Sequence, residues 1–195
     1  MENSWNQRYA QEEYVYGTEP NGFFKEELLK LQPGRILFPA EGEGRNAVYA
    51  ATQGWKVVAF DSSFEAKKKA EKLALKNNVT IDYQISTIED FENEEKSFDA
   101  IVLIYVHTDN REENHRKLVK YLKPGRKLII EGFSKNQLEN NSGGPRNLSM
   151  LLSVEELKSD FKTMNDIQFS ELDIELNEGL LHIGKASVIR VIATK

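Results

Sequence analysis

The chain has 195 residues, of which 39% are apolar and 29% charged, a balance that predicts a single domain over residues 1–195 with one hydrophobic core. Its 26 basic and 31 acidic residues give a net charge of −5, which disfavours a surface that binds nucleic acid. The absence of cysteine excludes disulfides, thiolate zinc sites and a cysteine nucleophile, and three scattered histidines predict no metal site.

The N-terminal residues lack a signal-peptide pattern, and the longest apolar run, Ala100–Val106, is too short to span a bilayer. We therefore expect a cytoplasmic protein without a membrane partner. The segment before the first predicted strand is rich in aromatic side chains. We expect this segment, residues 1–31, to fold back over the domain as a helical lid.

Short β-rich runs alternate with runs of helical period along the next hundred residues or so, which is typical of βαβ units. The predicted strands are Arg35–Phe38, Lys56–Phe60, Thr80–Gln84, Phe98–Tyr105 and Lys127–Phe133. The predicted helices between them are Arg45–Gln53, Glu65–Lys76 and Glu112–Leu122. Residues 101–104 are continuously apolar, which favours a central strand covered on both faces.

The polar segment 134–147 predicts a flexible loop, and a short helix is expected at Val154–Phe161. Two further runs without helical period, Ile167–Leu176 and Ser187–Ala193, flank a turn at Asn177–Gly179 and predict an antiparallel pair at one edge. The fold class predicted is α/β: an open, doubly wound, seven-stranded, mostly parallel sheet of Rossmann-like type, with the last strand antiparallel.

A glycine turn follows the first predicted strand and opens the first predicted helix at Gly42-Glu43-Gly44-Arg45. Glycine allows a tight turn and a close approach of the backbone to a ligand. Asp61 follows the second strand, where a carboxylate accepts hydrogen bonds from ribose hydroxyls. The two signals together indicate a nucleoside-containing cofactor, and the alternative is a tight strand–helix turn with a helix-capping aspartate.

The glycine spacing also fits a nicotinamide dinucleotide, whereas a P-loop is excluded because no Gly-Lys-Ser/Thr follows the glycines. Four features favour a methyl donor. They are the turn at Leu122-Lys123-Pro124-Gly125, the closing antiparallel pair, the aromatic N-terminal segment, and a length too short for a dinucleotide domain plus a catalytic domain.

With these features, nearly the whole chain resembles the small class I S-adenosylmethionine-dependent methyltransferases, in particular their tellurite-resistance-type and thiopurine-methyltransferase-like branch. The strings that carry the resemblance are Trp5-x-x-Arg8-Tyr9, Tyr14-x-Tyr16-Gly17, Gly42-Glu43-Gly44-Arg45-Asn46-Ala47, Val58-Ala59-Phe60-Asp61, Leu122-Lys123-Pro124-Gly125 and Gly179-x-x-His182-x-Gly184. The string from Gly42 to Ala47 is the most specific of them.

The resemblance implies S-adenosylmethionine as cofactor and assigns the residues that bind it. Gly42 and Gly44 would lie against the methionine part, and Asp61 with Ser62 would bind the ribose. The remaining implied contacts are the adenine at Ile88, the methionyl end at Tyr105, and a lid made by Trp5, Tyr9 and Tyr16.

The chain departs from the family pattern at three places near this turn. The first strand carries Phe38 in place of the usual acidic residue, and Ala40 in place of a glycine. Thr87 stands where an aspartate commonly precedes the residue that contacts adenine. A polar tether for the methionine amine is therefore missing from its usual position.

Two histidines are candidate catalytic bases. His107 follows the fourth strand at the edge where open α/β sheets bind ligands, and His182 belongs to the last family string. The alternatives are a solvated loop histidine and a hydrogen-bonded turn histidine. His115 is expected on the surface, and Arg146 is expected to be solvated, with binding of an anionic acceptor as its alternative.

The function expected is methyl transfer from S-adenosylmethionine to a small-molecule acceptor. A soft thiol or chalcogen acceptor needs at most deprotonation, and oxygen or nitrogen acceptors stay open. The alternatives are a non-catalytic cofactor-binding domain, as a sensor or degenerate partner, and a nicotinamide-dependent reductase. We expect a monomer or weak homodimer, without bound metal or nucleic acid.

Overall fold

The computed structural model describes residues 4–195, whose strands form one seven-stranded sheet in the order β3-β2-β1-β4-β5-β7-β6. The pairs β1–β2, β2–β3 and β4–β5 are parallel, and β7 runs antiparallel to β5. This architecture confirms the predicted fold class. Within the described part of the chain, no helix has the length and apolar character needed to cross a membrane.

The chain divides into two compact units. Unit 1 runs up to Glu92 and includes Glu178–Leu181, and unit 2 contains Asn93–Asn177 and His182–Lys195. The elements of unit 1 are α1 (Ser4–Tyr9), α2 (Gly22–Leu28), β1 (Arg35–Pro39), α3 (Arg45–Thr52), β2 (Lys56–Asp61), α4 (Phe64–Lys76) and β3 (Asp82–Ile85). The first two helices lie in the predicted lid segment, whose residues 1–3 lie outside the described part of the chain.

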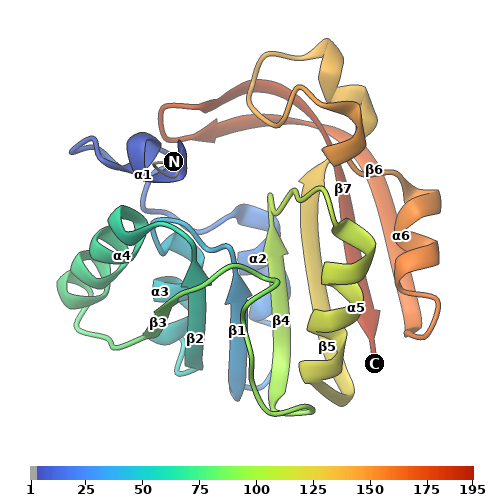
Figure 1. Cartoon of the computed structure of the whole chain (residues 1–195), viewed down its shortest axis with the longest axis horizontal. Helices are drawn as coiled ribbons and strands as arrows, with labels where there is room; N and C mark the ends of the chain where they lie inside the picture. The colour runs from blue at the N-terminus through green and yellow to red at the C-terminus, as the bar shows by residue number, and fades with distance from the viewer. Residues whose placement is uncertain (1–3) are drawn as a thin grey trace. The chain divides into compact units, whose positions relative to one another are not determined.

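Helix α4 shows how a local pattern sets the packing of unit 1. Ser63 caps the helix by accepting a hydrogen bond from the backbone N–H of Ala66 at 3.2 Å. The residues at helical spacing on its buried face are small or branched: Ala66, Ala70, Leu73 and Ala74. Figure 1 shows α4 beside β2 and β3, so that this face contributes to the core of the unit.

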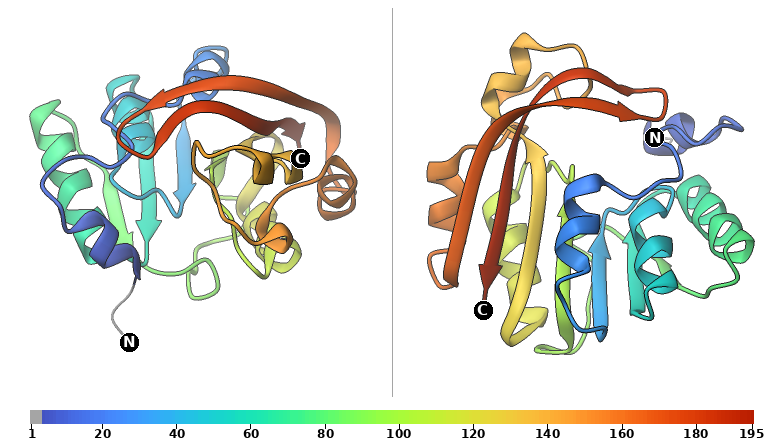
Figure 2. Two further views of the ribbon diagram at one scale, coloured as in Figure 1. Left: turned by 90° about the horizontal axis from the view of Figure 1, so that it is seen from above. Right: turned by 180° about the vertical axis from the view of Figure 1, so that it is seen from behind.

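Unit 2 contains β4 (Phe98–Ile104), α5 (Arg111–Tyr121), β5 (Leu122–Phe133), the 3-10 helices η1 (Lys135–Glu139) and η2 (Leu148–Met150), α6 (Val154–Asp160), β6 (Asn165–Glu178) and β7 (His182–Thr194). The apolar run of β4 is buried, as predicted for a strand covered on both faces. Strands β6 and β7 form a long hairpin that bends along its length (Figure 2).

Four strand starts differ from the prediction: β3 and β6 by two residues, and β5 and β7 by five. Strand β5 begins at Leu122 rather than Lys127, because Leu122 already pairs with Phe98 and the β4–β5 register shifts before Ala100 pairs with Lys127. Gly125, with a φ of 74°, donates its N–H to the carbonyl of Lys195 at 2.7 Å. Strand β7 begins at His182 rather than Ser187. Burial alternates along its first residues, but the buried residue is His182 and the exposed neighbour is Ile183, so the sequence carried no apolar period-two signal there.

The segment 134–147, predicted as a flexible loop, contains η1 and a buried glutamine. The side chain of Gln137 accepts a hydrogen bond from the N–H of Ser187 at 2.8 Å and donates to the carbonyl of Gly143 at 3.0 Å. Arg146, exposed as expected, donates to the carbonyl of Asn140 at 2.8 Å. Polar hydrogen bonds, rather than an apolar core, therefore fix the conformation of this segment.

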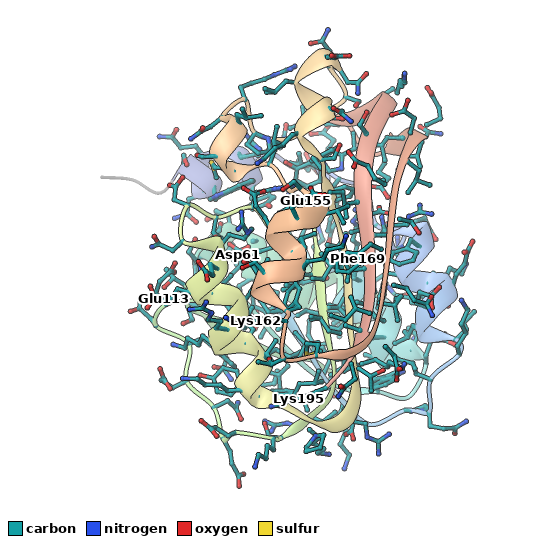
Figure 3. The ribbon with its side chains drawn as sticks, turned by 90° about the vertical axis from the view of Figure 1, so that its right-hand side faces the viewer. Asp61, Glu113, Glu155, Lys162, Phe169 and Lys195 are labelled. Carbon is teal, nitrogen blue, oxygen red and sulfur yellow. The ribbon has the colours of Figure 1, made fainter. Side chains whose placement is uncertain are left out.

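The expectation that His115 lies on the surface is wrong. Its side chain is buried between α5 and α6, where Nδ1 lies 2.8 Å from Oδ2 of Asp160 and the ring stacks on Phe161. Arg111 binds the same carboxylate at 2.8 Å. Figure 3 shows the two helices side by side, with Glu113 on α5 and Glu155 on α6. The residues next to His115 in the sequence are polar and therefore predicted exposure. Its partner, Asp160, lies on α6, far away in the sequence.

Candidate functional site

The glycine turn of unit 1 joins β1 to α3 and lies close to two other segments. Gly42 and Gly44 have φ angles of 65° and 88°, in the left-handed region that favours glycine. A Cβ atom on Gly44 would lie 2.6 Å from Cβ of Ala70, and one on Gly42 would lie 2.8 Å from Oη of Tyr9. Only glycine fits these positions without displacing α4 or the lid.

Asp61, at the end of β2, binds the glycine turn directly. Its Oδ2 accepts a hydrogen bond from Gly42 N–H at 3.1 Å, and its Oδ1 accepts one from Ser63 N–H at 2.9 Å. Burial raises the pKa of Asp61, and these backbone bonds oppose the rise. Each carboxylate oxygen has a further lone pair, so the group retains acceptor capacity for a hydroxyl pair.

The neighbouring predicted residues flank this centre within unit 1. Ser62 follows Asp61 and is half-buried, and Ile88 is buried in the segment after β3. Tyr83 of β3 donates its hydroxyl to the carbonyl of Gly42 at 2.5 Å. The β3 tyrosine is a contact that the sequence did not single out, because an aromatic residue in a strand usually indicates core packing alone.

The three predicted lid aromatics come together in unit 1. Trp5 stacks on Tyr9 with ring centres 5.6 Å apart, and Tyr16 lies edge-on to Tyr9 at 6.4 Å. The guanidinium of Arg8 lies 4.6 Å from the Trp5 ring centre and donates to the Tyr16 hydroxyl at 3.0 Å. Burial, and then the charge of Asp61, raise the pKa of Tyr9 well above its usual range. Tyr9 therefore remains a neutral phenol beside the glycine turn.

The string Gly42 to Ala47 also anchors the lid, a role that the sequence analysis missed. Glu43 is buried and accepts a hydrogen bond from Val15 N–H at 2.8 Å. Lys69 of α4 pairs with the same carboxylate at 2.7 Å and donates to the carbonyl of Glu13 at 2.6 Å. One buried carboxylate therefore holds the lid segment, the glycine turn and α4 together.

Arg45 and Asn46 extend this anchor to the β6–β7 turn. Arg45 pairs with Glu178 at 2.9 Å, and the side chain of Asn46 accepts a hydrogen bond from Asn21 N–H at 2.9 Å. A Cβ atom on Gly179 would lie 2.4 Å from the backbone N of Gly17, so these two glycines allow the two backbones to touch. The sequence carried one signal for these contacts. Glu43, Arg45 and Asn46, in and directly after the glycine turn, are charged or polar, and a turn that only approaches a phosphate or sugar does not need such side chains.

Tyr105 lies in unit 2, within a separate group of aromatic and charged side chains. Its hydroxyl donates to Oε1 of Glu131 at 2.8 Å, and Arg190 pairs with the other oxygen of that buried carboxylate at 2.6 Å. Its ring stacks on Phe133 at 4.6 Å and meets the edge of the buried His182 ring at 4.7 Å. Tyr105 has a φ angle of 55°, a strained conformation for a non-glycine residue.

His107 has both ring nitrogens engaged in unit 2. Nδ1 lies 2.8 Å from the carbonyl of Met150, and Nε2 accepts a hydrogen bond from Phe133 N–H at 3.2 Å. Burial lowers the pKa of His107 to about 4. In this geometry the ring is neutral with its proton on Nδ1, and a new proton on Nε2 would displace the Phe133 contact; the role of His107 as a base stays a prediction.

Comparison with known proteins finds a matching family and solved structures with a similar fold. Residues 36–125 match a family described as a methyltransferase domain. The ubiquinone biosynthesis O-methyltransferase of Rickettsia akari (strain Hartford) is 34% identical over 116 residues, 58% of this chain and 45% of that protein. The chain thus spans less than half the length of this relative. TehB from Haemophilus influenzae aligns with a TM-score of 0.70 at 16% identity, over 98% of this chain and 65% of that one.

Another solved structure comes from work described as "Conversion of a Disulfide Bond into a Thioacetal Group during Echinomycin Biosynthesis". It aligns with a TM-score of 0.76 at 16% identity, over 98% of this chain and 91% of that one. At such identities the two structures show the fold alone. The part that matches the methyltransferase-domain family, residues 36–125, makes up less than half of the chain. Two solved structures of a phosphoethanolamine N-methyltransferase 2 from Haemonchus contortus, which align at 17% and 15% identity, are complexes with S-adenosylhomocysteine and S-adenosylmethionine.

The described residues around the glycine turn of unit 1 fit a ligand of the kind that these structures bind. The left-handed glycines bring the backbone of the turn close to Tyr9, and a carboxylate with spare lone pairs, Asp61, is bonded to that turn. S-adenosylmethionine supplies an electrophilic methyl group on a sulfonium.

Proposed function

We propose that the chain transfers a methyl group from S-adenosylmethionine to a small-molecule acceptor. The observation that carries the proposal is the bond between Asp61 and Gly42, which joins a strand-end carboxylate to a glycine turn within the segment that matches a methyltransferase-domain family. In this assignment Gly42 and Gly44 lie against the methionine part, Asp61 and Ser62 bind the ribose, and Ile88 contacts the adenine.

Methyl transfer from a sulfonium requires alignment and exclusion of water more than acid–base chemistry. The lid residues Trp5, Tyr9 and Tyr16 serve that role in the proposal, since their ring faces attract a cation. One face of Trp5 already carries Arg8 at 4.6 Å, so Tyr9 and Tyr16 are better placed to respond to the sulfonium charge.

We propose the acceptor only by its chemical class. A thiol or reduced chalcogen needs at most removal of one proton, and a phenolic oxygen, which the name of the Rickettsia relative suggests, needs a base. Of the two histidines predicted as bases, His182 is retained and His107 is not, because both nitrogens of His107 hold the backbone. Tyr105, bonded to Glu131, orients the methionyl end or the acceptor.

The proposal is tested by titration calorimetry with S-adenosylmethionine, followed by detection of S-adenosylhomocysteine in the presence of thiols, reduced selenium and tellurium species, and dihydroxybenzenes. Donor binding together with product formed from at least one acceptor class supports it. Donor binding without product across the panel would favour the non-catalytic cofactor-binding alternative. Quenching of NADPH fluorescence in place of donor binding would favour the reductase.

A further inference from the structure

Three carboxylates lie at the glycine turn, and in two of them both oxygens accept hydrogen bonds from the protein. Glu43 binds Lys69 with one oxygen and Val15 N–H with the other. Asp61 binds a backbone N–H with each oxygen. Glu41, the third, uses Oε1 alone, which accepts hydrogen bonds from Asn46 N–H at 2.9 Å and from Ala47 N–H at 2.7 Å.

The second oxygen of Glu41 has no hydrogen-bond partner among residues 4–195, and it is not enclosed, because the only enclosed side-chain atom without a partner in that range is Oγ of Ser134. The nearby cation, Arg45, is held by Glu178 at 2.9 Å. Glu41 therefore presents a half-buried carboxylate oxygen at the turn that no protein cation neutralises by contact.

Glu41 also decides which charged group can approach the start of α3. Its Oε1 occupies the amides of the second and third residues of the helix, which are among the groups that would otherwise bind an anion. A second carboxylate brought to the same amides would meet a negative charge. The α-ammonium group of S-adenosylmethionine, in contrast, would bring a positive charge and N–H donors to the second oxygen of Glu41.

We propose that Oε2 of Glu41 binds the α-ammonium group of S-adenosylmethionine. The inference rests on the proposed function and deepens it, because it assigns a polar contact that the first strand, with Phe38, does not provide. The sulfonium is a poorer match for this oxygen, since it has no N–H to donate. Glu41 thereby acts both as the cap of α3 and as the counter-charge of the donor.

This contact makes donor binding depend on pH. Burial raises the pKa of Glu41 to about 7; the backbone bonds and Arg45 oppose the rise, and Asp61 adds to it. Tyr83 on β3 also faces the group, and the charge of Glu41 contributes to raising the pKa of this tyrosine. A cation on Oε2 favours the ionised form, so binding at neutral pH releases about half a proton, and affinity falls as pH decreases.

The test compares S-adenosylmethionine with 5′-methylthioadenosine, which keeps the adenosine and lacks the amino acid. Between about pH 7 and about pH 5.5 the dissociation constant of S-adenosylmethionine should rise about fifteenfold, and that of methylthioadenosine should stay flat. Calorimetry in two buffers of different ionisation enthalpy measures the proton released at neutral pH. The same pH dependence for both ligands would overturn the inference.

Glu41→Gln keeps an acceptor oxygen for the two amides and removes the charge. The variant should bind methylthioadenosine normally and S-adenosylmethionine about tenfold more weakly at pH 7, without the pH dependence. Glu71→Gln, which removes an exposed carboxylate on α4, is the matched control and should change neither affinity. Unchanged binding of S-adenosylmethionine by Glu41→Gln would reject the contact and leave the proposed function standing. Failure of the unmodified chain to bind either ligand would reject both.

Discussion

Asp61 is the residue whose chemistry the sequence located most directly. Asp61→Ala should weaken binding of S-adenosylmethionine by about 1–3 kcal/mol, because ribose hydroxyls lose a charged acceptor and Gly42 N–H loses its partner. Titration calorimetry measures the change. Asp82→Ala, which removes an exposed carboxylate on β3, is the control, and equal affinities of the two variants would contradict the ribose assignment.

Gly44 tests whether the turn needs glycine for its backbone angle or for its closeness to α4. Gly44→Ala should lower the free energy of unfolding by about 2–4 kcal/mol, because it combines a left-handed φ with an overlap on Ala70. Gly54 has a similar φ of 86° and nothing within 4 Å, so Gly54→Ala should cost only about 1 kcal/mol. Denaturant unfolding measures both, and equal costs would show that closeness contributes nothing.

His107 carries a pH prediction of definite sign. Its folded pKa of about 4 lies below the ordinary 6.5, so the unfolded chain binds more protons between these values, and the stability contributed by the neutral ring is lost as pH falls. From about pH 7 to about pH 5 the loss amounts to about 2 kcal/mol. The free energy of unfolding of His107→Gln should lack this component. A constant difference between the two proteins across this range would contradict it.

At the scale of elements, the lid is attached by a buried ion pair. Lys69→Met leaves the Glu43 carboxylate, of which 2% is exposed, without its cation, and should lower the free energy of unfolding by about 3 kcal/mol. Lys67→Met on the same helix breaks an exposed pair and should change it by less than about 0.5 kcal/mol. Thermal unfolding compares the two variants, and similar melting temperatures would show that the lid anchor is unimportant for stability.

The elements themselves were largely predictable, because each strand and helix of the βαβ part carries its own period. Helix α4 was predicted within one residue, since its small buried face and its Ser63 cap are both local. The starts of β5 and β7 were not, because a Pro-Gly pair normally indicates a turn and because β7 starts with a buried histidine next to an exposed isoleucine, the reverse of the usual pattern.

At the scale of the whole molecule, unit 1 is not a continuous stretch of chain, since it includes Glu178–Leu181. A fragment of residues 1–92 therefore lacks the carboxylate that pairs with Arg45 and the backbone that contacts Gly17. We expect this fragment to melt without a cooperative transition by circular dichroism, whereas the full chain melts cooperatively. A cooperative melt of the fragment at the temperature of the full chain would show that the turn is not needed.

The sequence by itself determined the fold class, the glycine turn and the strand-end aspartate. Both signals are local, because the apolar period and the glycines that allow left-handed turns can be recognised from neighbouring residues. Only the tertiary structure decided which polar residues serve the fold. It buried His115 against Asp160, engaged both nitrogens of His107 and used Glu43 to hold the lid. Hydrogen-bond partners far apart in the chain satisfy these groups, and sequence spacing carries no record of such partners.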